Sequence, residues 1–434
     1  MNLTIIIASF LIIYLLFIWK AGSVFPILYL FLFTYFVQYV FSVFLIYNEY
    51  PVLRKQMPIR QDQLFDFVIP ALVFLFVGVF AFNKDVSLRQ HLKRINPRDA
   101  ANLGHLLLAI SFFFDFLSII GVLGIQSLIS FTFYLKFIGA MCYLFSPSLL
   151  NYFLLIVSYL TLAGVAIRGG VFMDFFMWST YLFLIASLRF GLSLKVRSLF
   201  IVLTIPLLVL IQSAKEEYRQ VTWKGKSEAS ISLLTDIAIK KNESNNVPFT
   251  KSEGVVRTVG RLNQGWHLGK VLKWVPKHEA FANGADFWGD IKGTILPRIF
   301  FSDKKIIGGQ DKFSRFTGHK LIGGTSMTIG VLGDFYINFG RWGAFIGLFI
   351  FGAIVSRLFY LFVKKNIIPD PINIIWLPFL FSYLVRANND FYIVINSFVK
   401  GYLIFLFVTY LRKSIWPRTT IQNSHSQKKI QHSN

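Results

Sequence analysis

Residues 3–46 decide the fold class, and they read LTIIIASFLIIYLLFIWKAGSVFPILYLFLFTYFVQYVFSVFLI. Two apolar runs, 3–19 and 24–46, are separated only by Lys20-Ala21-Gly22-Ser23. A transmembrane helix needs about 20 apolar residues to cross roughly 30 Å of hydrocarbon, and both runs are close to that length. Because no small-residue cleavage site follows the first run, we expect it to be a retained span and not a signal peptide.

The same pattern recurs along the chain of 434 residues. Hydrophobic residues make up 55% and charged residues 15% of the sequence, whereas soluble domains carry about 25% charged residues. The composition predicts an all-α fold, a polytopic transmembrane helix bundle of about eleven spans with one large outward-facing, partly helical loop. The predicted spans are 3–19, 24–46, 65–82, 103–123, 128–146, 149–167, 171–188, 198–213, 342–363, 372–386 and 391–411. Three are weaker, because 128–146 contains Lys136 and because 198–213 and 372–386 are short.

The Lys and Arg residues of the short loops predict the orientation. With the C-terminal tail placed in the cytoplasm, the short cytoplasmic segments contain sixteen Lys and Arg and the short outer loops contain five. Cytoplasmic loops accumulate these residues. The predicted protein is therefore multi-pass, with its N-terminus outside and its C-terminus in the cytoplasm.

This topology divides the chain into four parts: an N-terminal bundle of about eight spans (1–213), a large outer loop (214–327), C-terminal spans (328–411) and a disordered tail (412–434). The loop contains nineteen Lys and Arg against eleven Asp and Glu. Long loops are translocated regardless of charge, so the basic loop is compatible with the topology. Its charge has two interpretations, attraction to anionic membrane lipids or binding of an anionic ligand.

Several functional classes are disfavoured. The net charge of +23 follows from the basic cytoplasmic loops, so no nucleic-acid partner is predicted. The single cysteine, Cys142, excludes an intramolecular disulfide and a cysteine-based metal site. The sequence contains neither a Walker A motif nor HExxH, and we predict no metal and no cofactor. No internal repeat of the kind that marks secondary transporters is found.

The loop contains a candidate phosphate-binding face. Residues 253–274 have helical periodicity that places Val255, Val259, Leu262 and Trp266 on one side. Arg257 and Arg261 fall on the opposite side, one turn apart. Arginine suits phosphate because its planar fork donates two hydrogen bonds. The alternative is an ordinary solvated helix face.

Further candidates lie later in the loop. The stretch Ala282–Gly289 is rich in glycine and aromatic residues, and it includes Trp288. An exposed aromatic ring can stack on the C–H face of a sugar, whereas the structural alternative is a loop core. Arg298, followed by Lys304-Lys305, is a further cationic point.

Charged residues also lie beside the last spans. Asp334 belongs to the apolar segment 325–340, for which we expect a short helix at the outer interface. Arg386 and Asp390 lie between two spans on the same predicted side, and we expect them to form an ion pair. Charges at such depth are costly and are usually paired or functional.

These motifs together resemble the Wzy-type polymerases, integral membrane enzymes that polymerise O-antigen or exopolysaccharide repeat units. The similarity covers the whole architecture, a set of about ten to twelve spans with one large outward loop late in the chain. The matching patterns are Arg257-x-x-x-Arg261-Leu262-Asn263, Leu296-Pro297-Arg298 with Lys304, Gly333-Asp334-Phe335-Tyr336-x-Asn338-Phe339-Gly340-x-x-Gly343, and Arg386 with Asn389-Asp390-Phe391, Asn396 and Lys400. Members of the family often carry Glu at the position of Asp334.

The resemblance implies glycosyl transfer at the outer face of the bacterial inner membrane. The donor would be an undecaprenyl-pyrophosphate-linked oligosaccharide and the acceptor a sugar hydroxyl on a second lipid-linked unit. Membrane lipids, a flippase and a chain-length regulator are the implied partners. Fixed cations would stabilise the leaving pyrophosphate, and a carboxylate would act as base. The cation candidates are Arg257, Arg261, Arg298 and Arg386. The base candidates are Asp334 and Asp390, and the candidates for sugar contact or an auxiliary role are His267, Trp288, His319 and Tyr336.

Two other functions fit parts of the pattern. An O-antigen ligase shares this layout but transfers the glycan to lipid A core. A transporter or flippase of lipid-linked sugars should have repeats and a polar path across the whole membrane. The predicted gathering of polar residues on one face favours an enzyme, and one sequence does not separate a polymerase from a ligase.

Overall fold

The computed structural model describes residues 3–120, 131–225, 227–243, 251–295, 310–321 and 326–416. Within these ranges the regular secondary structure is all helical, and no β-strand is present. Eight helices are long and apolar enough to cross a bilayer, which confirms the predicted class of fold. The count of eleven spans is not confirmed. Two of the apolar segments form only short helices, Leu135–Phe145 and Pro371–Val385, and a third helix carries charged residues near both ends.

Six of the eight long helices come from the N-terminal half. They are α1 (Leu3–Lys20), the continuous helix made of α2 (Ile27–Phe36), η1 (Val37–Phe41) and α3 (Ser42–Glu49), then α5 (Gln61–Phe82), α7 (Pro97–Ile119), α10 (Leu149–Gly169) and α12 (Leu194–Trp223). Side-chain caps set several starts: Asn96, Ser148 and Ser193 accept backbone N–H groups of α7, α10 and α12. The segment 198–213, expected to be a weak span, is thus part of a helix of 30 residues.

Shorter helices complete this half. Helix α11 (Met173–Phe190) is the helix with charged residues near both ends that was mentioned above. Helix α9 (Leu135–Cys142) continues into η2 (Tyr143–Phe145). The helices α4 (Pro51–Arg54) and α6 (Arg89–Leu92) lie in connections.

The described residues of the segment between the two halves form five short helices. They are α13 (Ile231–Glu243), α14 (Glu253–Leu262), α15 (Gly265–Trp274), α16 (Ala285–Ile295) and α17 (Gln310–Thr317). The predicted single helix over 253–274 is wrong, because the chain breaks at Asn263 and Gln264. There the Gln264 N–H donates to the Gln38 carbonyl of η1 instead of continuing the helix. Helix α16 packs on α18 and α20, so part of this segment lies within the bundle.

The C-terminal half is built from two helical hairpins. Helix α18 (Gly330–Phe362) reverses at Gly340, where φ is 66° and ψ −170°, a conformation open mainly to glycine. Phe335 consequently packs on Phe351, with ring centroids 5.8 Å apart. The half-helix 330–339 therefore lies antiparallel to the long helix that follows it.

The second hairpin follows directly. Helix α18 continues into η5 (Val363–Ile367), and η6 (Pro371–Ile375) leads into α19 (Trp376–Val385). The chain then breaks at 386–390 and returns as α20 (Phe391–Ile415). Both hairpins bring a broken helix end into the bundle.

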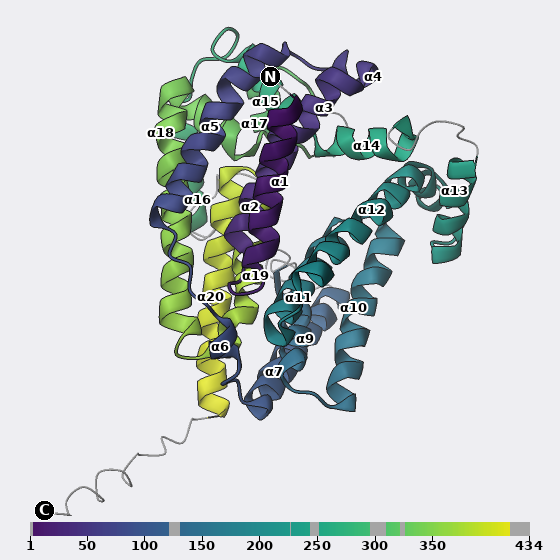
Figure 1. Ribbon diagram of the computed structural model, residues 1–434, viewed down its shortest axis with the longest axis vertical. Helices are drawn as coiled ribbons and strands as arrows, with labels where there is room; N and C mark the ends of the chain where they lie inside the picture. Colours follow the sequence, from purple (N-terminus) through teal and green to yellow (C-terminus); the bar gives the residue numbers. More distant parts are fainter. Residues whose placement is uncertain are drawn as a thin grey trace, which may run out of the picture.

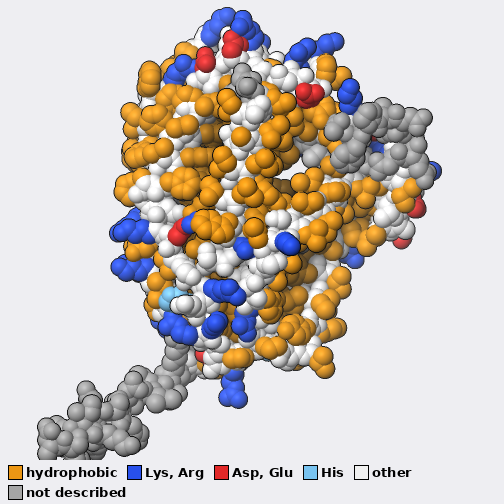
Figure 2. Space-filling view, in the orientation of Figure 1, with side chains coloured by type: hydrophobic (Ala, Val, Ile, Leu, Met, Phe, Trp, Pro, Cys, Tyr) orange, Lys and Arg blue, Asp and Glu red, His pale blue; other side chains and the backbone are white. Residues whose placement is uncertain are grey.

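The two ends of the molecule are formed by different helices (Figure 1). The N-terminus lies at the same end as α14, α15 and α17, whereas α20 finishes at the opposite end. Hydrophobic side chains cover most of the middle of the face in Figure 2, and Lys and Arg gather above and below them. This distribution suits a chain whose middle lies in lipid.

Candidate functional site

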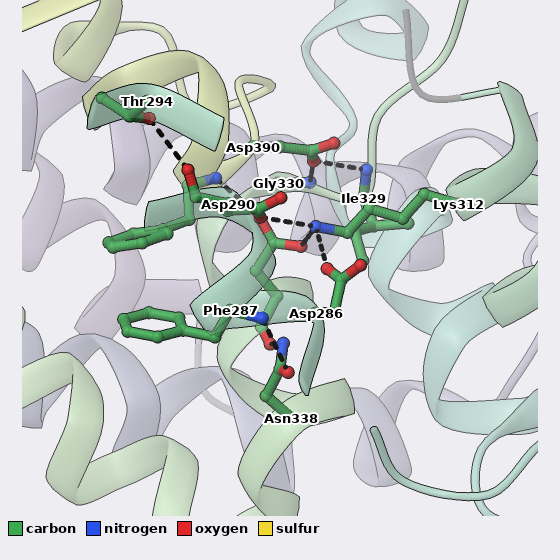
Figure 3. A network of polar contacts seen from close by, with 11 residues as sticks. Asp286, Phe287, Asp290, Thr294, Lys312, Ile329, Gly330, Asn338 and Asp390 are labelled. Atoms are coloured by element: carbon green, nitrogen blue, oxygen red, sulfur yellow. Dashed lines mark hydrogen bonds and ion pairs between the residues drawn. The ribbon is translucent and has the colours of Figure 1, made fainter. Parts of the chain in front are cut away.

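Lys312 of α17 lies in the interior of the protein, where several carboxylates surround its ammonium group. Its Nζ lies 2.5 Å from Asp334 Oδ1, 2.7 Å from Asp286 Oδ2 and 3.4 Å from Asp290 Oδ2. Figure 3 shows its ammonium group between the carboxylates of α16. The lysine side chain is 11% exposed, so these ion pairs are removed from bulk solvent. We call Lys312, Asp286, Asp290, Asp334 and Asp390 the aspartate–lysine cluster.

Electrostatics hold Lys312 in its charged form. Burial alone favours the neutral amine, but the surrounding carboxylates of Asp334, Asp390, Asp290 and Asp286 outweigh burial and raise the lysine pKa well above its ordinary value. One permanent cation therefore faces four carboxylates. Buried carboxylates are costly unless cations or backbone N–H groups stabilise them.

Backbone groups provide part of this stabilisation. Asp390 Oδ1 accepts hydrogen bonds from the Ile329 and Gly330 N–H groups at 2.9 and 2.8 Å, at the start of the half-helix (Figure 3). Asp334 Oδ2 accepts from the Phe391 N–H at 2.6 Å, at the start of α20. Each carboxylate thus holds the N-terminus of the other hairpin, where the helix dipole favours negative charge.

The break between α19 and α20 lies beside the middle of a long apolar helix. The Thr34 hydroxyl donates to the Val385 carbonyl at 2.7 Å, and the Tyr39 hydroxyl donates to the Ala387 carbonyl at 3.3 Å. Thr34 and Tyr39 are near the centre of the apolar helix 27–49. Non-helical backbone at such a depth is tolerated where protein surrounds it.

The position of the two carboxylates at the outer boundary of the membrane stays a prediction, but both side chains are buried within the protein. Asp390 adjoins this mid-helix break, and Asp334 is 1% exposed in the half-helix. The sequence did not indicate this burial, because the reversal at Gly340 folds residues 330–339 back into the bundle.

The predicted ion pair between Arg386 and Asp390 is also wrong. Arg386 forms its ion pair with Asp174 in the first turn of α11, and Asp174 also accepts from the Tyr134 hydroxyl at 2.9 Å. The backbone of Arg386 is not helical, with φ −84° and ψ 101°. The side chains of Arg386 and Asp390 are therefore not placed one helical turn apart, and they bind different partners. A neighbouring pair joins Lys136 to Asp115 at 2.5 Å, which gives Lys136 a partner within its apolar segment.

A second group of charges lies where α12 meets α14, and it consists of cations. Lys215 is 9% exposed, and its charge is close enough to Arg219 and Arg261 to interact with both. Arg219 Nε donates to the Gly170 carbonyl at 3.0 Å, and its guanidinium lies 4.7 Å from the Trp223 ring centroid. In the described part of the chain, neither Lys215 nor Arg261 has an ion pair or a hydrogen bond from its side chain. We call Lys215, Arg219 and Arg261 the cation cluster.

The nearby acids are engaged elsewhere. Arg257 pairs with Glu253, with Nε 2.8 Å from Oε1, and with Glu216 of α12. Lys241 lies 3.7 Å from Glu217 and 3.5 Å from Glu253. Arg257 and Arg261 thus differ although they were predicted as one face: carboxylates occupy the fork of Arg257, whereas Arg261 belongs to the cation cluster.

Among the remaining predicted residues, His267 and His319 lie close together because both pack against Trp266 and Phe313, whereas the others are dispersed. His267 Nδ1 donates a hydrogen bond to Gln264 Oε1 at 2.9 Å, and burial lowers its pKa to about 4. His319 is exposed and packs edge-on against Trp266, with ring centroids 5.7 Å apart. Trp288 is 60% exposed on α16. Arg298 lies outside the described residues.

Tyr336 faces away from the aspartate–lysine cluster. Its hydroxyl donates to the Val275 carbonyl at 3.2 Å, and its ring packs edge-on against Phe67. It therefore joins α18 to α5 and to the end of α15.

Sequence reasoning missed most members of both clusters. Lys312 falls in QDKFSRFT, where Phe313 and Phe316 are both buried. That spacing indicates an amphipathic helix whose polar residues lie near a buried face. Lys215 and Arg219 lie in residues read as the start of a loop, although the helix continues to Trp223.

The described residues contain no group of three or more His, Cys, Asp and Glu side chains arranged to hold a metal ion. No family model, curated protein or solved structure matches the chain.

Proposed function

We propose that this protein polymerises lipid-linked oligosaccharide repeat units at the outer face of a bacterial inner membrane. In the reaction, a sugar hydroxyl oxygen of one unit attacks the anomeric carbon of another. The bond from that carbon to the undecaprenyl pyrophosphate breaks, the pyrophosphate leaves with the bonding electrons, and the hydroxyl proton passes to a base. The chemical demand on the protein is to bind and stabilise a leaving pyrophosphate.

The observation that carries the proposal is the cation cluster. Three like charges converge on the junction of α12 and α14, and the buried Lys215 has no acid partner in the described ranges. Unpaired buried charge is costly, so such a group is explained by an anionic ligand that completes it. A pyrophosphate carries the charge and the acceptor oxygens that Lys and Arg bind.

The geometry supports a positioning role for Asp334 and Asp390 better than the expected role as base. Asp334 is 1% exposed, and its oxygens contact Lys312 and the Phe391 N–H. A sugar hydroxyl does not reach a carboxylate enclosed in this way. In the proposal, the two aspartates fix α16, α17 and the hairpins against one another and so shape the site around them.

The test is polymerisation in proteoliposomes that contain the full-length protein and a synthetic lipid-linked repeat unit. Lys215→Ala/Arg261→Ala should lose polymer formation by about 100-fold or more, because two charge-assisted contacts to the leaving group disappear. Lys240→Ala/Lys251→Ala is the matched control, since it removes two exposed lysines of the same segment. Wild-type activity in the first variant would contradict the assignment, and no polymer from the wild-type protein would contradict the function.

One observation favours a second candidate, a transporter of lipid-linked sugars. Discontinuous helices and charged residues near mid-span are typical of transport sites, and the hairpin ends with the aspartate–lysine cluster have this form. Movement of a fluorescent lipid-linked oligosaccharide between leaflets, measured in the same proteoliposomes, separates this function from transfer. A ligase is separated by supplying lipid A core as the acceptor.

A further inference from the structure

A large cleft opens at the end of the molecule that holds the N-terminus, apart from both clusters described above. Its volume is about 1250 Å³. It is lined by the connection from α3 to α5, the end of α15, and α18 on both sides of its reversal at Gly340. Ligand sites usually enclose about 300–1,000 Å³, so the cleft has room for a group larger than a single phosphate.

The cleft is rich in cations. Arg54, Arg60, Lys273 and Arg341 line it, against one acid, Asp62. Asp62 is already paired with Arg60, at 2.5 Å. Arg54 donates to the Tyr47 carbonyl at 3.4 Å and has no ion pair among the described residues. Three positive groups from three separate parts of the chain are therefore left to act on the contents of the cleft.

Lys273 and Arg341 are the freest of the four. Neither side chain forms an ion pair or a hydrogen bond within the described ranges. Residues Gln61–Gln63 also line the cleft and form the first turn of α5, an end at which the helix dipole favours an anion. Convergent cations from different elements and a helix N-terminus point to a ligand with negative charge.

Much of the rest of the lining is apolar or aromatic, although Asn48, Gln61 and Gln63 also contribute to it. Phe67, Tyr336, Ile59 and Leu272 belong to it. The hydroxyl of Tyr336 is bonded to the Val275 carbonyl, so the tyrosine presents its ring and not a free hydroxyl. A ligand that combines an anionic head with an apolar or ring-shaped part matches this wall better than a bare anion.

The cleft is distinct from the aspartate–lysine cluster. Tyr336 lines the cleft, and Asp334 binds Lys312. The two residues are two positions apart on one helix, which places their side chains on roughly opposite faces. The half-helix 330–339 thus forms a wall between the cleft and the cluster.

We propose that this cleft binds the phosphate-bearing head of an amphiphile. A membrane phospholipid and a lipid-linked pyrophosphate share this chemistry. Polymerisation needs two lipid-linked substrates, so under the function proposed above the cleft holds the pyrophosphate of the second one. That last assignment rests on the proposed function, whereas the binding of a phosphate-bearing amphiphile does not.

The experiment measures binding to the purified full-length protein and needs no turnover. Farnesyl pyrophosphate and inorganic pyrophosphate are titrated in detergent, and phosphatidylglycerol retained in nanodiscs is counted by native mass spectrometry. Lys273→Ala/Arg341→Ala should weaken farnesyl pyrophosphate binding or phosphatidylglycerol retention by at least about tenfold. Lys240→Ala/Lys251→Ala, which removes two exposed lysines away from the cleft lining, should change neither.

The two binding measurements identify the kind of molecule that carries the phosphate. Loss of farnesyl pyrophosphate binding alone supports a lipid-linked pyrophosphate, and loss of phosphatidylglycerol retention alone supports a membrane phospholipid. Inorganic pyrophosphate should bind more weakly than farnesyl pyrophosphate, because it leaves the apolar wall uncovered. Unchanged binding of both amphiphiles in Lys273→Ala/Arg341→Ala would overturn the proposal. If the variant loses binding and the wild-type protein forms no polymer, the cleft remains a binding site for a phosphate-bearing amphiphile and only the proposed function is contradicted.

Discussion

Lys312 Nζ lies 2.5 Å from Asp334 Oδ1, and this contact joins the segment between the two halves of the bundle to the half-helix 330–339. Both side chains are shielded from solvent, at 11% and 1% exposure. The same ammonium group also reaches Asp286 and Asp290 of α16. A single lysine therefore ties α16, α17 and α18 together.

Removing this lysine should destabilise the protein strongly. Lys312→Met leaves three buried carboxylates without their cation, and loss of one partner of a buried ion pair costs about 3–5 kcal/mol. Lys312→Met/Asp334→Asn should cost less than the sum of the single changes, because one uncompensated charge disappears as well. Equilibrium unfolding in mixed micelles checks this. Arg315→Ala on the same helix is the control, since its pair with Glu279 is exposed and should contribute below about 1 kcal/mol.

His267 should make stability depend on acid pH. Burial lowers its folded-state pKa to about 4, against 6.5 for the free side chain. The folded state therefore binds fewer protons than the unfolded state between these values. Its contribution to stability is present above pH 6.5 and is lost as the pH falls through about 4. The loss is at most about 3 kcal/mol before solvent screening.

The measurement is the free energy of unfolding between pH 7 and 4 for the wild type and His267→Gln. The wild type should lose more stability than this variant over that range. His278→Gln, at an exposed position, should follow the wild-type curve. If the free energies of unfolding of the wild type and of His267→Gln change in parallel with pH, His267 is not the titrating group.

The cation cluster should be unfavourable for stability and necessary for ligand binding. Lys215→Met removes a buried, unpaired charge beside Arg219 and Arg261, so the apo protein should become more stable, by about 1 kcal/mol or more. Pyrophosphate should stabilise the wild type more than the variant, in which only the cleft described above remains to bind it. Thermal unfolding with and without pyrophosphate measures both effects. A less stable Lys215→Met protein would indicate that the lysine has a structural partner.

Arg261 should be sensitive to the shape of its cation. Arg261→Ala should abolish polymer formation in cells while membrane insertion stays intact. Arg261→Lys should restore it only in part, because an ammonium group does not form the bidentate contact of guanidinium. Polymer length on gels, with protein amount in the membrane as reference, provides the readout. Full activity of Arg261→Ala would exclude this side chain from the site.

The partner of Arg386 can be identified by substitution. Asp174→Asn leaves Arg386 without its ion pair and should reduce stability by about 3 kcal/mol. Asp174→Arg/Arg386→Asp should recover part of that loss. Asp390→Asn should act differently, because Asp390 binds the Ile329 and Gly330 N–H groups. If Arg386→Asp were rescued by Asp390→Arg instead, the pairing described above would be incorrect.

Sequence predicted the helices better than their contacts. Apolar run length located every long helix, because a membrane-spanning helix must satisfy its own backbone and must therefore be continuous and apolar. It could not detect the reversal at Gly340, since residues 330–339 are mostly apolar and lead directly into the span that follows. Whether such a segment crosses the bilayer or folds back depends on what it packs against.

The contacts of charged residues could not be predicted from the sequence for a different reason. Arg386 and Asp174 are 212 residues apart, whereas Asp390 is close in the chain, so proximity in sequence favoured the wrong partner. Lys312 is one of nineteen basic residues in its segment. Only its position between Asp286, Asp290 and Asp334 distinguishes it.

The half-helix 330–339 also limits the order in which the protein can be assembled. Ten residues that carry Asp334 are too short and too polar to be held by lipid alone. The contacts of the half-helix include Lys312, Val275 and Phe287, made earlier, and the Phe391 N–H and Asp390, made later. We therefore expect this segment to reach its final position only after α20 has been synthesised, and a chain truncated before Asp390 should be more readily degraded by proteases.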